Sequence, residues 1–271
     1  MDDAPAWLDE LDLDPGAEPV RMGTRRLGDR PWLLADADRS EQLELKARLS
    51  RTRPDEVFAT LPDTERAGAE VAQLVADTGV VLVDGDDLHP LDRAGRSVQE
   101  DLCLLRRTDA GWILVAASLC FPSRWRLAEK LGRDITAVHD PVPGYRRRLA
   151  PGVTHLFDRL AELPVVRRNW FIHPDPALFQ PGRPPGGDPL VPAERCLDEL
   201  YVRSERQTLR TLADRSWILF TIKIQQATLR ELVDRRRAEV GAWLAGAPES
   251  ARTHRGVPPD QAVELRHALG A

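Results

Sequence analysis

The sequence contains six histidines, a residue type that can bind a metal or transfer a proton near neutral pH. One of them, His139, has an unusual sequence context. His139 follows an apolar neighbourhood that includes Ile135 and Val138, and Pro141 and Pro143 come directly after it. Proline fixes φ and limits backbone freedom. A metal-binding imidazole has to be held in a fixed orientation. His139 is therefore a candidate metal ligand. The alternative is a structural role, which is the more common one for a lone histidine.

The other five histidines occur in less constrained contexts. His89 and His173 each precede a proline in turn-like segments, and His155 lies in an expected helix. His254 and His267 lie in an expected surface segment near the C-terminus. We interpret His155 as a packing or surface residue.

Three arginines, Arg124, Arg126 and Arg133, precede His139 in a short amphipathic segment. One interpretation is a solvated helix face. The other is recognition of carboxylates, because a guanidinium donates parallel hydrogen bonds to both carboxylate oxygens. The residues alone leave both interpretations open.

Polar residues are dense in the strand-like segment 203–208. Side chains alternate between the two faces of a strand, so Arg203, Glu205 and Gln207 share one face. The pattern indicates either a sheet face that lines a polar cavity or an exposed edge. A second polar segment, residues 168–170 (Arg-Asn-Trp), is most simply a strand end with a buried tryptophan.

Several common functional motifs are absent from the sequence. It contains no glycine-rich phosphate loop, no His-x-x-x-His or Cys-x-x-Cys pair and no Gly-x-Ser-x-Gly elbow. The three cysteines, Cys103, Cys120 and Cys196, are far apart and lie in apolar surroundings. We expect buried, inert thiols rather than disulfides or a tetrathiolate iron–sulfur cluster.

The composition is that of an ordinary globular protein of one large domain or two small ones. The chain has 271 residues, is 42% hydrophobic and carries a net charge of −5. This charge offers no general attraction to nucleic acid or to a membrane, so neither is expected as a partner. Without a membrane span or an N-terminal signal pattern, the expected compartment is the cytoplasm.

Hydrophobic periodicity predicts helices at residues 38–49, 54–58, 63–78, 151–163, 227–247 and 259–269. It predicts strands at residues 80–83, 101–107, 112–119, 165–172, 200–209 and 216–224, with the apolar run 112–119 in the middle of the sheet. Asp38 and Glu41 have the spacing of a capping box. Consecutive hairpins favour an α+β fold with one antiparallel sheet over a doubly wound parallel sheet.

We expect three segments along the chain. Residues 1–20 contain seven acidic side chains and no basic one, interleaved with Trp7, Leu8, Leu11 and Leu13. This composition indicates either a disordered acidic tail or a segment that docks its apolar residues on this protein or a partner. Residues 21–250 form the main domain, and residues 251–271 form a helical tail.

Four blocks of the sequence resemble the haem-dependent oxidative N-demethylase family, whose characterised members act on dimethylamine. The longest block runs from residues 117–126 (ASLCFPSRWR) to residues 139–145 (HDPVPGY). The shorter blocks, in the family's order, are HPLD at 89–92 with QEDL at 99–102, RNW at 168–170 with DPALF at 175–179, and RSERQTL at 203–209 with LFTI at 219–222. With residues 53–58, the resemblance covers roughly residues 22–245.

The resemblance implies a PAS-like haem-binding domain, with a five-stranded antiparallel sheet and helices on one side, here elaborated by helical extensions at both termini. It also implies haem b, dioxygen, and electrons from NADPH through FMN and an iron–sulfur cluster. This chain has neither the glycines nor the cysteines to bind those carriers, so reductase or ferredoxin-type partner subunits are implied. The expected reaction is oxidation of an N-methyl group of a small secondary amine, with release of formaldehyde.

Residue roles follow from the resemblance. His139 is the expected iron ligand, and Arg124, Arg126 and Tyr145 are expected to contact the propionates or the haem edge. Glu205 and Asn169 are the expected catalytic residues.

Trp170 and Gln207 are the expected substrate walls, and a protonated amine favours a carboxylate or aromatic faces nearby. The chain departs from the family at Lys223-Ile224-Gln225, where Arg-Thr-Tyr is usual, which places the substrate or the activity in doubt.

A haem-binding sensor or carrier without turnover is the alternative function, because a fold does not by itself decide function. A haem-free interaction module is a third possibility, which predicts a colourless protein.

Overall fold

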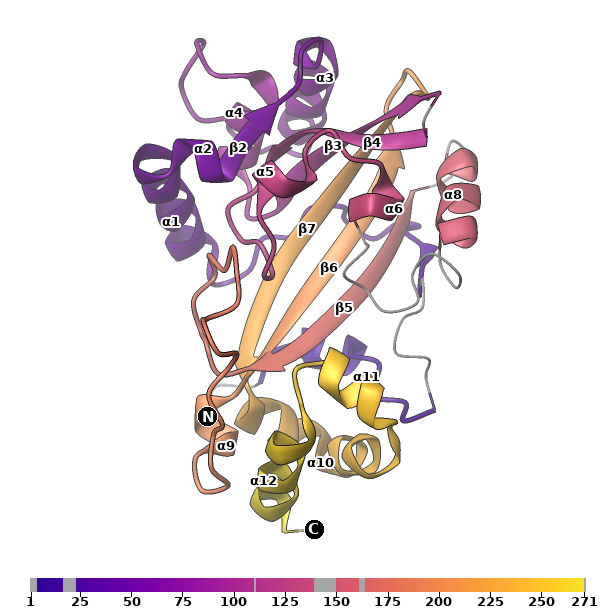
Figure 1. Cartoon of the computed structure of the whole chain (residues 1–271). Helices are drawn as coiled ribbons and strands as arrows, with labels where there is room; N and C mark the ends of the chain where they lie inside the picture. The colour runs from indigo at the N-terminus through magenta and orange to yellow at the C-terminus, as the bar shows by residue number, and fades with distance from the viewer. Residues whose placement is uncertain (1–3, 17–22, 110, 139–149, 161–163, 271) are drawn as a thin grey trace.

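A single open sheet organises the part of the chain that the computed structural model describes, which comprises residues 4–16, 23–109, 111–138, 150–160 and 164–270 (Figure 1). Its seven strands lie in the order β1-β5-β6-β7-β3-β4-β2, and every pair of neighbours is antiparallel. The strands are β1 (Arg25–Arg26), β2 (Phe58–Thr60), β3 (Asp101–Thr108), β4 (Gly111–Ser118), β5 (Val165–His173), β6 (Tyr201–Thr211) and β7 (Trp217–Thr228).

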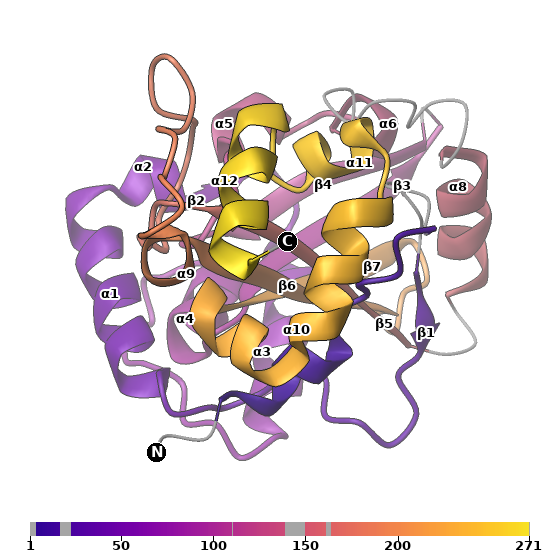
Figure 2. The ribbon, with the colours of Figure 1, turned by 90° about the horizontal axis from the view of Figure 1, so that it is seen from below.

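Helices cover both faces and one end of this sheet (Figures 1 and 2). In chain order they are the 3₁₀ helix η1 (Ala6–Glu10), α1 (Arg39–Thr52), α2 (Pro54–Val57), α3 (Glu65–Ala76), α4 (Pro90–Ser97), α5 (Leu127–Lys130), α6 (Ile135–Val138), α8 (Ala150–Arg159), α9 (Cys196–Glu199), α10 (Leu229–Gly246), α11 (Glu249–His254) and α12 (Pro259–Leu269). Among the described helices, α10 has the clearest start, a capping box in which Thr228 and Glu231 bond reciprocally.

Strand alternation divides the sheet into two faces that pack on different helices. On one side, which we call the α3 face, Leu104 and Leu219 pack with Val71 of α3. On the other side, the α8 face, Leu105 and Leu209 pack with Phe157 of α8 and with Leu160, which directly follows that helix. The β6–β7 hairpin sets this division over its whole length, because its register runs without a shift from Tyr201 opposite Thr228 to Thr211 opposite Ile218.

A third apolar cluster closes one end of the sheet, where α10, α11 and α12 gather (Figure 2). Leu8, Leu11 and Leu13 are buried in it beside Trp170 and Trp243. Residues 4–16, which we call the N-terminal strap, are therefore packed, and the disordered alternative is wrong for them. Their acidic side chains meet arginines, with Glu10 3.0 Å from Arg168 and Asp9 2.5 Å from Arg235. The C-terminal segment is likewise packed, since Ala251, Val257, Ala262 and Leu265 are buried in the same cluster. The division into three segments otherwise stays a prediction.

A buried polar network fixes the start of the segment that leads to residue 139. Lys46 of α1 is fully buried, and its Nζ lies 3.3 Å from Asp101 Oδ1 and donates to the Glu100 carbonyl at 2.6 Å. Asp101 in turn accepts the backbone N–H groups of Cys120 and Phe121, both at 2.8 Å. Burial raises the pKa of Asp101, and Lys46 and the two N–H donors oppose that shift. The chain leaving β4 is thereby held against α1 and β3.

Most of the expected elements are present, and the α+β class with an antiparallel sheet is confirmed. Residues 80–83 are not a strand; Val81 is 88% exposed, and no described strand pairs with the segment. The centre of the sheet is β7 rather than β4, which has only the short β2 beyond it. Asp38 caps α1 without a side-chain hydrogen bond, so the capping box is not formed there.

The sheet has seven strands rather than five, because β1 and β2 extend it. Helices on one side only is wrong as well, because α3 and α4 pack on its second face. The PAS-like assignment stays a prediction.

Candidate functional site

A cavity of about 700 Å³ lies on the α8 face of the sheet, beneath α6 and α8. Apolar side chains form its walls over β3, β4 and β7, and α6 and α8 add further apolar groups. These residues include Leu105, Leu114, Ile135, Val138, Phe157 and Phe220. Toward β5 the lining becomes polar and charged, so the cavity has one apolar and one hydrophilic side.

The polar floor of the cavity is built by neighbouring residues of β5 and β6. Asn169 lies opposite Glu205 in the register, and both line the cavity together with Gln207. Gln207 Nε2 donates to Glu205 Oε2 at 2.8 Å, and Asn169 Oδ1 accepts from Arg255. β6 lies between β5 and β7, so the cavity interpretation of segment 203–208 is confirmed and the exposed-edge alternative is wrong. The sequence therefore located three residues that the structure brings together.

Arg203 lies on the same face of β6 but ties loops together instead of lining the cavity. Arg203 is 1% exposed, and its guanidinium donates to carbonyl oxygens of two segments, Phe121 and Pro122 in one and Ala177 and Leu178 in the other. It also donates to Ser123 Oγ at 2.9 Å and to Gln226 Oε1 at 2.8 Å. Burial lowers the pKa of Arg203 to about 10. Loops 121–123 and 177–180 are thus anchored beside the cavity.

The three arginines near residue 130 differ in position. Arg124 lines the cavity and has a φ of 65°. Its guanidinium forms a bidentate ion pair with Asp188, with distances of 2.8 and 2.6 Å. Arg126 lies outside the cavity; its side chain is 64% exposed and only 3.7 Å from Glu129. Arg133 is exposed as well. The solvated-face interpretation holds for these last two, and the expected contact of Arg126 with a cofactor has no support from its position.

Trp170 does not line the cavity, contrary to expectation. Adjacent residues of a strand point to opposite faces, so Asn169 and Trp170 cannot both face the same space. Trp170 is 1% exposed, packs edge-on against Trp243 at 5.1 Å and donates to the Asp12 carbonyl at 3.1 Å. It is a core residue that holds the N-terminal strap.

His139 and Tyr145 lie outside the described residues. The described chain leads directly to His139 through α6, whose Ile135 and Val138 line the cavity. On the other side, α8 contributes Val153, Leu156 and Phe157 to the same cavity.

Two residues of the cavity, His254 and Arg255, were missed because the sequence placed them in a surface tail. The His254 ring lies 6.1 Å from the Phe171 ring, and burial lowers the pKa of His254. Gly256 permits this approach: its φ is 87°, and a Cβ there would lie 2.0 Å from the Ile172 carbonyl oxygen. The glycine was the one sequence signal of a close backbone approach in this segment.

Three further histidines lie outside the cavity lining. His89 caps α4, where its Nδ1 accepts the Leu91 N–H at 3.1 Å and its Nε2 lies 3.1 Å from Thr64 Oγ1. His173 is 4% exposed, its ring nitrogens have no hydrogen-bond partner among the described residues, and burial lowers its pKa to about 4. His155 is exposed on α8.

Residues 223–225, where the sequence differs from the usual pattern of the family that it resembles, lie outside the cavity lining. Lys223 and Gln225 point to the α3 face, where Lys223 Nζ is 3.0 Å from Asp36 Oδ2 and Gln225 accepts from Arg168. Ile224 points to the α8 face but is fully buried outside the cavity lining. These contacts therefore give no reason to expect that the departure at residues 223–225 alters the substrate site.

All three cysteines are buried and free, as expected. Burial raises the pKa of Cys103 far above its ordinary value, that of Cys120 to about 12 and that of Cys196 to about 11. Cys103 lines the cavity, but such a thiol is a poor metal ligand because the thiolate is the ligating form. No group of three metal-binding side chains of the His, Cys, Asp and Glu types occurs within the described ranges.

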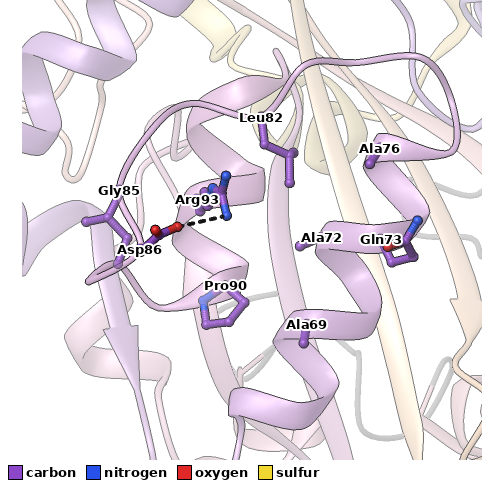
Figure 3. Close-up of a pocket in the computed structure, with 10 residues that line it drawn as sticks. Ala69, Ala72, Gln73, Ala76, Leu82, Gly85, Asp86, Pro90 and Arg93 are labelled. Carbon is purple, nitrogen blue, oxygen red and sulfur yellow. Dashed lines mark ion pairs between the residues drawn. The ribbon is translucent and has the colours of Figure 1, made fainter.

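A second hollow of about 300 Å³ lies between α3 and α4 (Figure 3). Its lining includes Ala69, Ala72 and Ala76 of α3, and its one pair of charged side chains is Arg93 and Asp86, 3.7 Å apart. It contains neither a histidine nor a nucleophilic side chain. The larger cavity is therefore the candidate functional site.

The fold and the cavity together define an α+β protein with one partly apolar, partly charged cavity on one face of an antiparallel sheet. The model of the family "haem-dependent oxidative N-demethylase, alpha subunit-like" matches residues 78–263, and the chain belongs to this family. This confirms the resemblance read from the sequence. No curated protein matches the sequence.

The family assignment has two consequences. Its name implies dependence on haem, and its designation as an alpha subunit implies partner subunits. Among the described helices, none is long and apolar enough to cross a membrane.

Proposed function

We propose that the chain is the haem-binding subunit of an oxidative N-demethylase, which removes a methyl group from a small secondary amine such as dimethylamine and releases formaldehyde. The observation that carries the proposal is the cavity on the α8 face, which combines apolar walls with the carboxylate of Glu205 on its floor. Most of the lining residues fall within the segment that matches the family.

The residues present fit a haem. A volume of about 700 Å³ lies within the range of roughly 300–1,000 Å³ of ligand and cofactor pockets. Leu105, Phe157 and Phe220 offer apolar contacts to a flat macrocycle. Six basic and three acidic side chains line the same cavity within the described residues, which suits a ligand with two carboxylates. Bound haem would supply the activation of dioxygen.

His139 is the proposed iron ligand. Two observations support it: the residue before it in the chain, Val138, lines the cavity, and the Cys103 thiol is held protonated by burial. His254 is the one histidine that lines the cavity within the described residues, and it is the competing candidate. Arg124 and Tyr145 remain proposed contacts of the haem edge.

Glu205 is proposed to bind the protonated amine. It is 8% exposed and lines the cavity, and the one hydrogen bond of its carboxylate within the described residues is accepted by Oε2. Gln207 holds its orientation through the hydrogen bond to Oε2, and Asn169 lies opposite it in the register of β5 and β6. A buried carboxylate selects a cation over a neutral molecule of the same shape.

Replacing Glu205 by glutamine keeps the shape of the side chain and removes its charge. We expect the dissociation constant for dimethylammonium, measured from the change in the haem absorption spectrum, to rise roughly ten- to a hundredfold. The Soret band without amine should be unchanged. Glu129→Gln, at an exposed site outside the cavity, is the control. Equal amine affinity in Glu205→Gln and the control would remove Glu205 from this role.

Electrons are proposed to come from NADPH through FMN and an iron–sulfur cluster on partner subunits, because this chain has no phosphate-binding glycine loop and its cysteines are buried. The test of the whole function is formaldehyde release from dimethylamine by the haem-loaded chain with a reductase and NADPH. A haem protein that releases no formaldehyde from a panel of methylated amines would instead be the sensor or carrier.

A further inference from the structure

Arg124, which lines the cavity, has a backbone that is fixed by contacts on both sides. Its φ of 65° lies in the left-handed region, which residues other than glycine seldom adopt. Its N–H donates to the Gln180 carbonyl at 2.7 Å, and Oγ of the preceding residue, Ser123, accepts from Arg203 at 2.9 Å. Such a backbone conformation persists only where the surrounding structure imposes it. The side chain of Arg124 therefore starts from a fixed point at the cavity wall.

The guanidinium of Arg124 is held along one edge by Asp188. Nη1 donates to Asp188 Oδ2 at 2.8 Å and Nη2 donates to Oδ1 at 2.6 Å, and the two side chains are 13% and 22% exposed. An arginine carries five N–H donors in a planar fork, and this pair uses two of them. The Nε–H belongs to the other edge of the fork, and it makes no hydrogen bond to a described residue. Asp188 thus occupies one edge of the guanidinium and leaves the second edge for a ligand.

Asp188 reaches Arg124 from a surface loop, residues 181–190, rather than from the sheet. The loop lies between two buried residues, Gln180 and Val191, and most of its residues are exposed. Gly186 and Gly187, directly before Asp188, have φ values of 84° and 87°, which other residues rarely adopt. Within this exposed loop Asp188 itself is only partly exposed, because its carboxylate lies against Arg124. The turn at the two glycines therefore places one carboxylate beside the wall of the cavity.

We propose that Asp188 is a positioning residue of the cofactor site, which holds Arg124 by one edge of its guanidinium so that the other edge binds a propionate carboxylate of the haem. This assignment rests on the proposed function, in which Arg124 contacts the haem edge. Two parallel hydrogen bonds to a carboxylate require the plane of the guanidinium to be set. A side chain that is already held loses less conformational entropy when the ligand binds. One guanidinium can serve both carboxylates because its two edges point in different directions.

A comparison of haem b with its dimethyl ester tests the proposal, because the ester keeps the macrocycle and removes both negative charges. The full chain without haem is titrated with each compound, and the Soret absorbance gives the dissociation constants. We expect the unmodified protein to bind haem roughly tenfold more tightly than the ester. Arg124→Gln should lower this preference severalfold. Asp188→Asn keeps the shape of the side chain but removes its charge, and it should lower the preference in the same direction while leaving the affinity for the ester unchanged.

The double variant Arg124→Gln/Asp188→Asn shows whether Asp188 acts through Arg124. If it does, the double variant has the same preference as Arg124→Gln alone, because the two effects are not additive. Asp198→Asn is the matched control: Asp198 forms a bidentate pair with Arg230 at 2.5 and 2.6 Å, and both residues lie outside the cavity lining. The control should keep the full preference for haem.

Three results would overturn the proposal. Asp188→Asn with an unchanged preference would show that Arg124 does not need its partner, and a raised preference would make Asp188 a competitor of the propionate. An equal loss of affinity for haem and for the ester would indicate a structural role alone. If neither compound binds the unmodified chain, the proposed function itself fails.

Discussion

Replacing Lys46 by methionine is expected to lower the free energy of unfolding by about 3–5 kcal/mol, because it leaves Asp101 as a buried carboxylate without its counter-ion. Both side chains are fully buried, and Lys46 Nζ also donates to the carbonyls of Gly95 and Glu100 at 3.0 and 2.6 Å. Methionine fills much of the same volume, so the loss of stability measures the contribution of the charge and its hydrogen bonds rather than the cost of a cavity. Equilibrium unfolding in urea, followed by far-ultraviolet circular dichroism on the haem-free chain, measures it.

Arg48→Met is the control for this experiment, because Arg48 is exposed on the same helix, α1. Its change should stay within about 0.5 kcal/mol. If Lys46→Met costs no more unfolding free energy than the control, the pair of Lys46 and Asp101 does not stabilise the fold. Because Asp101 holds the backbone of Cys120 and Phe121, haem affinity should fall in Lys46→Met as well.

Arg203→Met is the second change with a large expected effect, a loss of about 3–5 kcal/mol of unfolding free energy. The substitution removes the donors to four carbonyl groups of loops 121–123 and 177–180 and leaves those oxygens without a charged partner. Limited proteolysis should then cut first in these two loops, because their anchor to β6 is gone. The same urea titration gives the magnitude.

Lysine at position 203 separates the charge of the guanidinium from its shape. Arg203→Lys keeps one positive charge but has three donors on a single nitrogen, so it cannot reach both loops with the fork of the arginine. We expect a stability between those of the unmodified protein and Arg203→Met. Arg195→Met, at a site that is 55% exposed on the surface, should be neutral. A stability of Arg203→Met close to that of Arg195→Met would show that the loops are held by other contacts.

Much of the sheet was predictable from the sequence because strand alternation is a local property. The side chains of Glu205 and Gln207 could be placed on one face from their spacing alone, and in the structure both line the floor of the cavity. The same rule should have separated Asn169 from Trp170, since neighbouring residues of a strand point to opposite faces. Applied consistently, alternation predicts Asn169 in the cavity and Trp170 in the core.

Other features depend on contacts between distant parts of the chain. The apolar run 80–83 has strand propensity, yet the place beside β4 is taken by β2, and Val81 is exposed instead. Arg255 reaches the cavity only because Gly256 allows the turn after α11 to approach β5. The N-terminal strap is acidic in isolation, and its burial becomes understandable only once Arg168 and Arg235 are seen beside it. Contacts between distant segments leave no pattern in the local sequence from which they could be predicted.

The central claim is that the chain binds haem in the cavity on the α8 face through His139. A Soret titration of the haem-free chain with haem b tests it most directly, with His139→Ala compared with the unmodified protein and with His155→Ala, an exposed histidine on α8. We expect one haem per chain, the same spectrum in His155→Ala, and a shifted and much weaker Soret band in His139→Ala. An unchanged band in His139→Ala, with its loss in His254→Ala instead, would contradict the assignment of the ligand. A chain that stays colourless with excess haem would contradict the whole account.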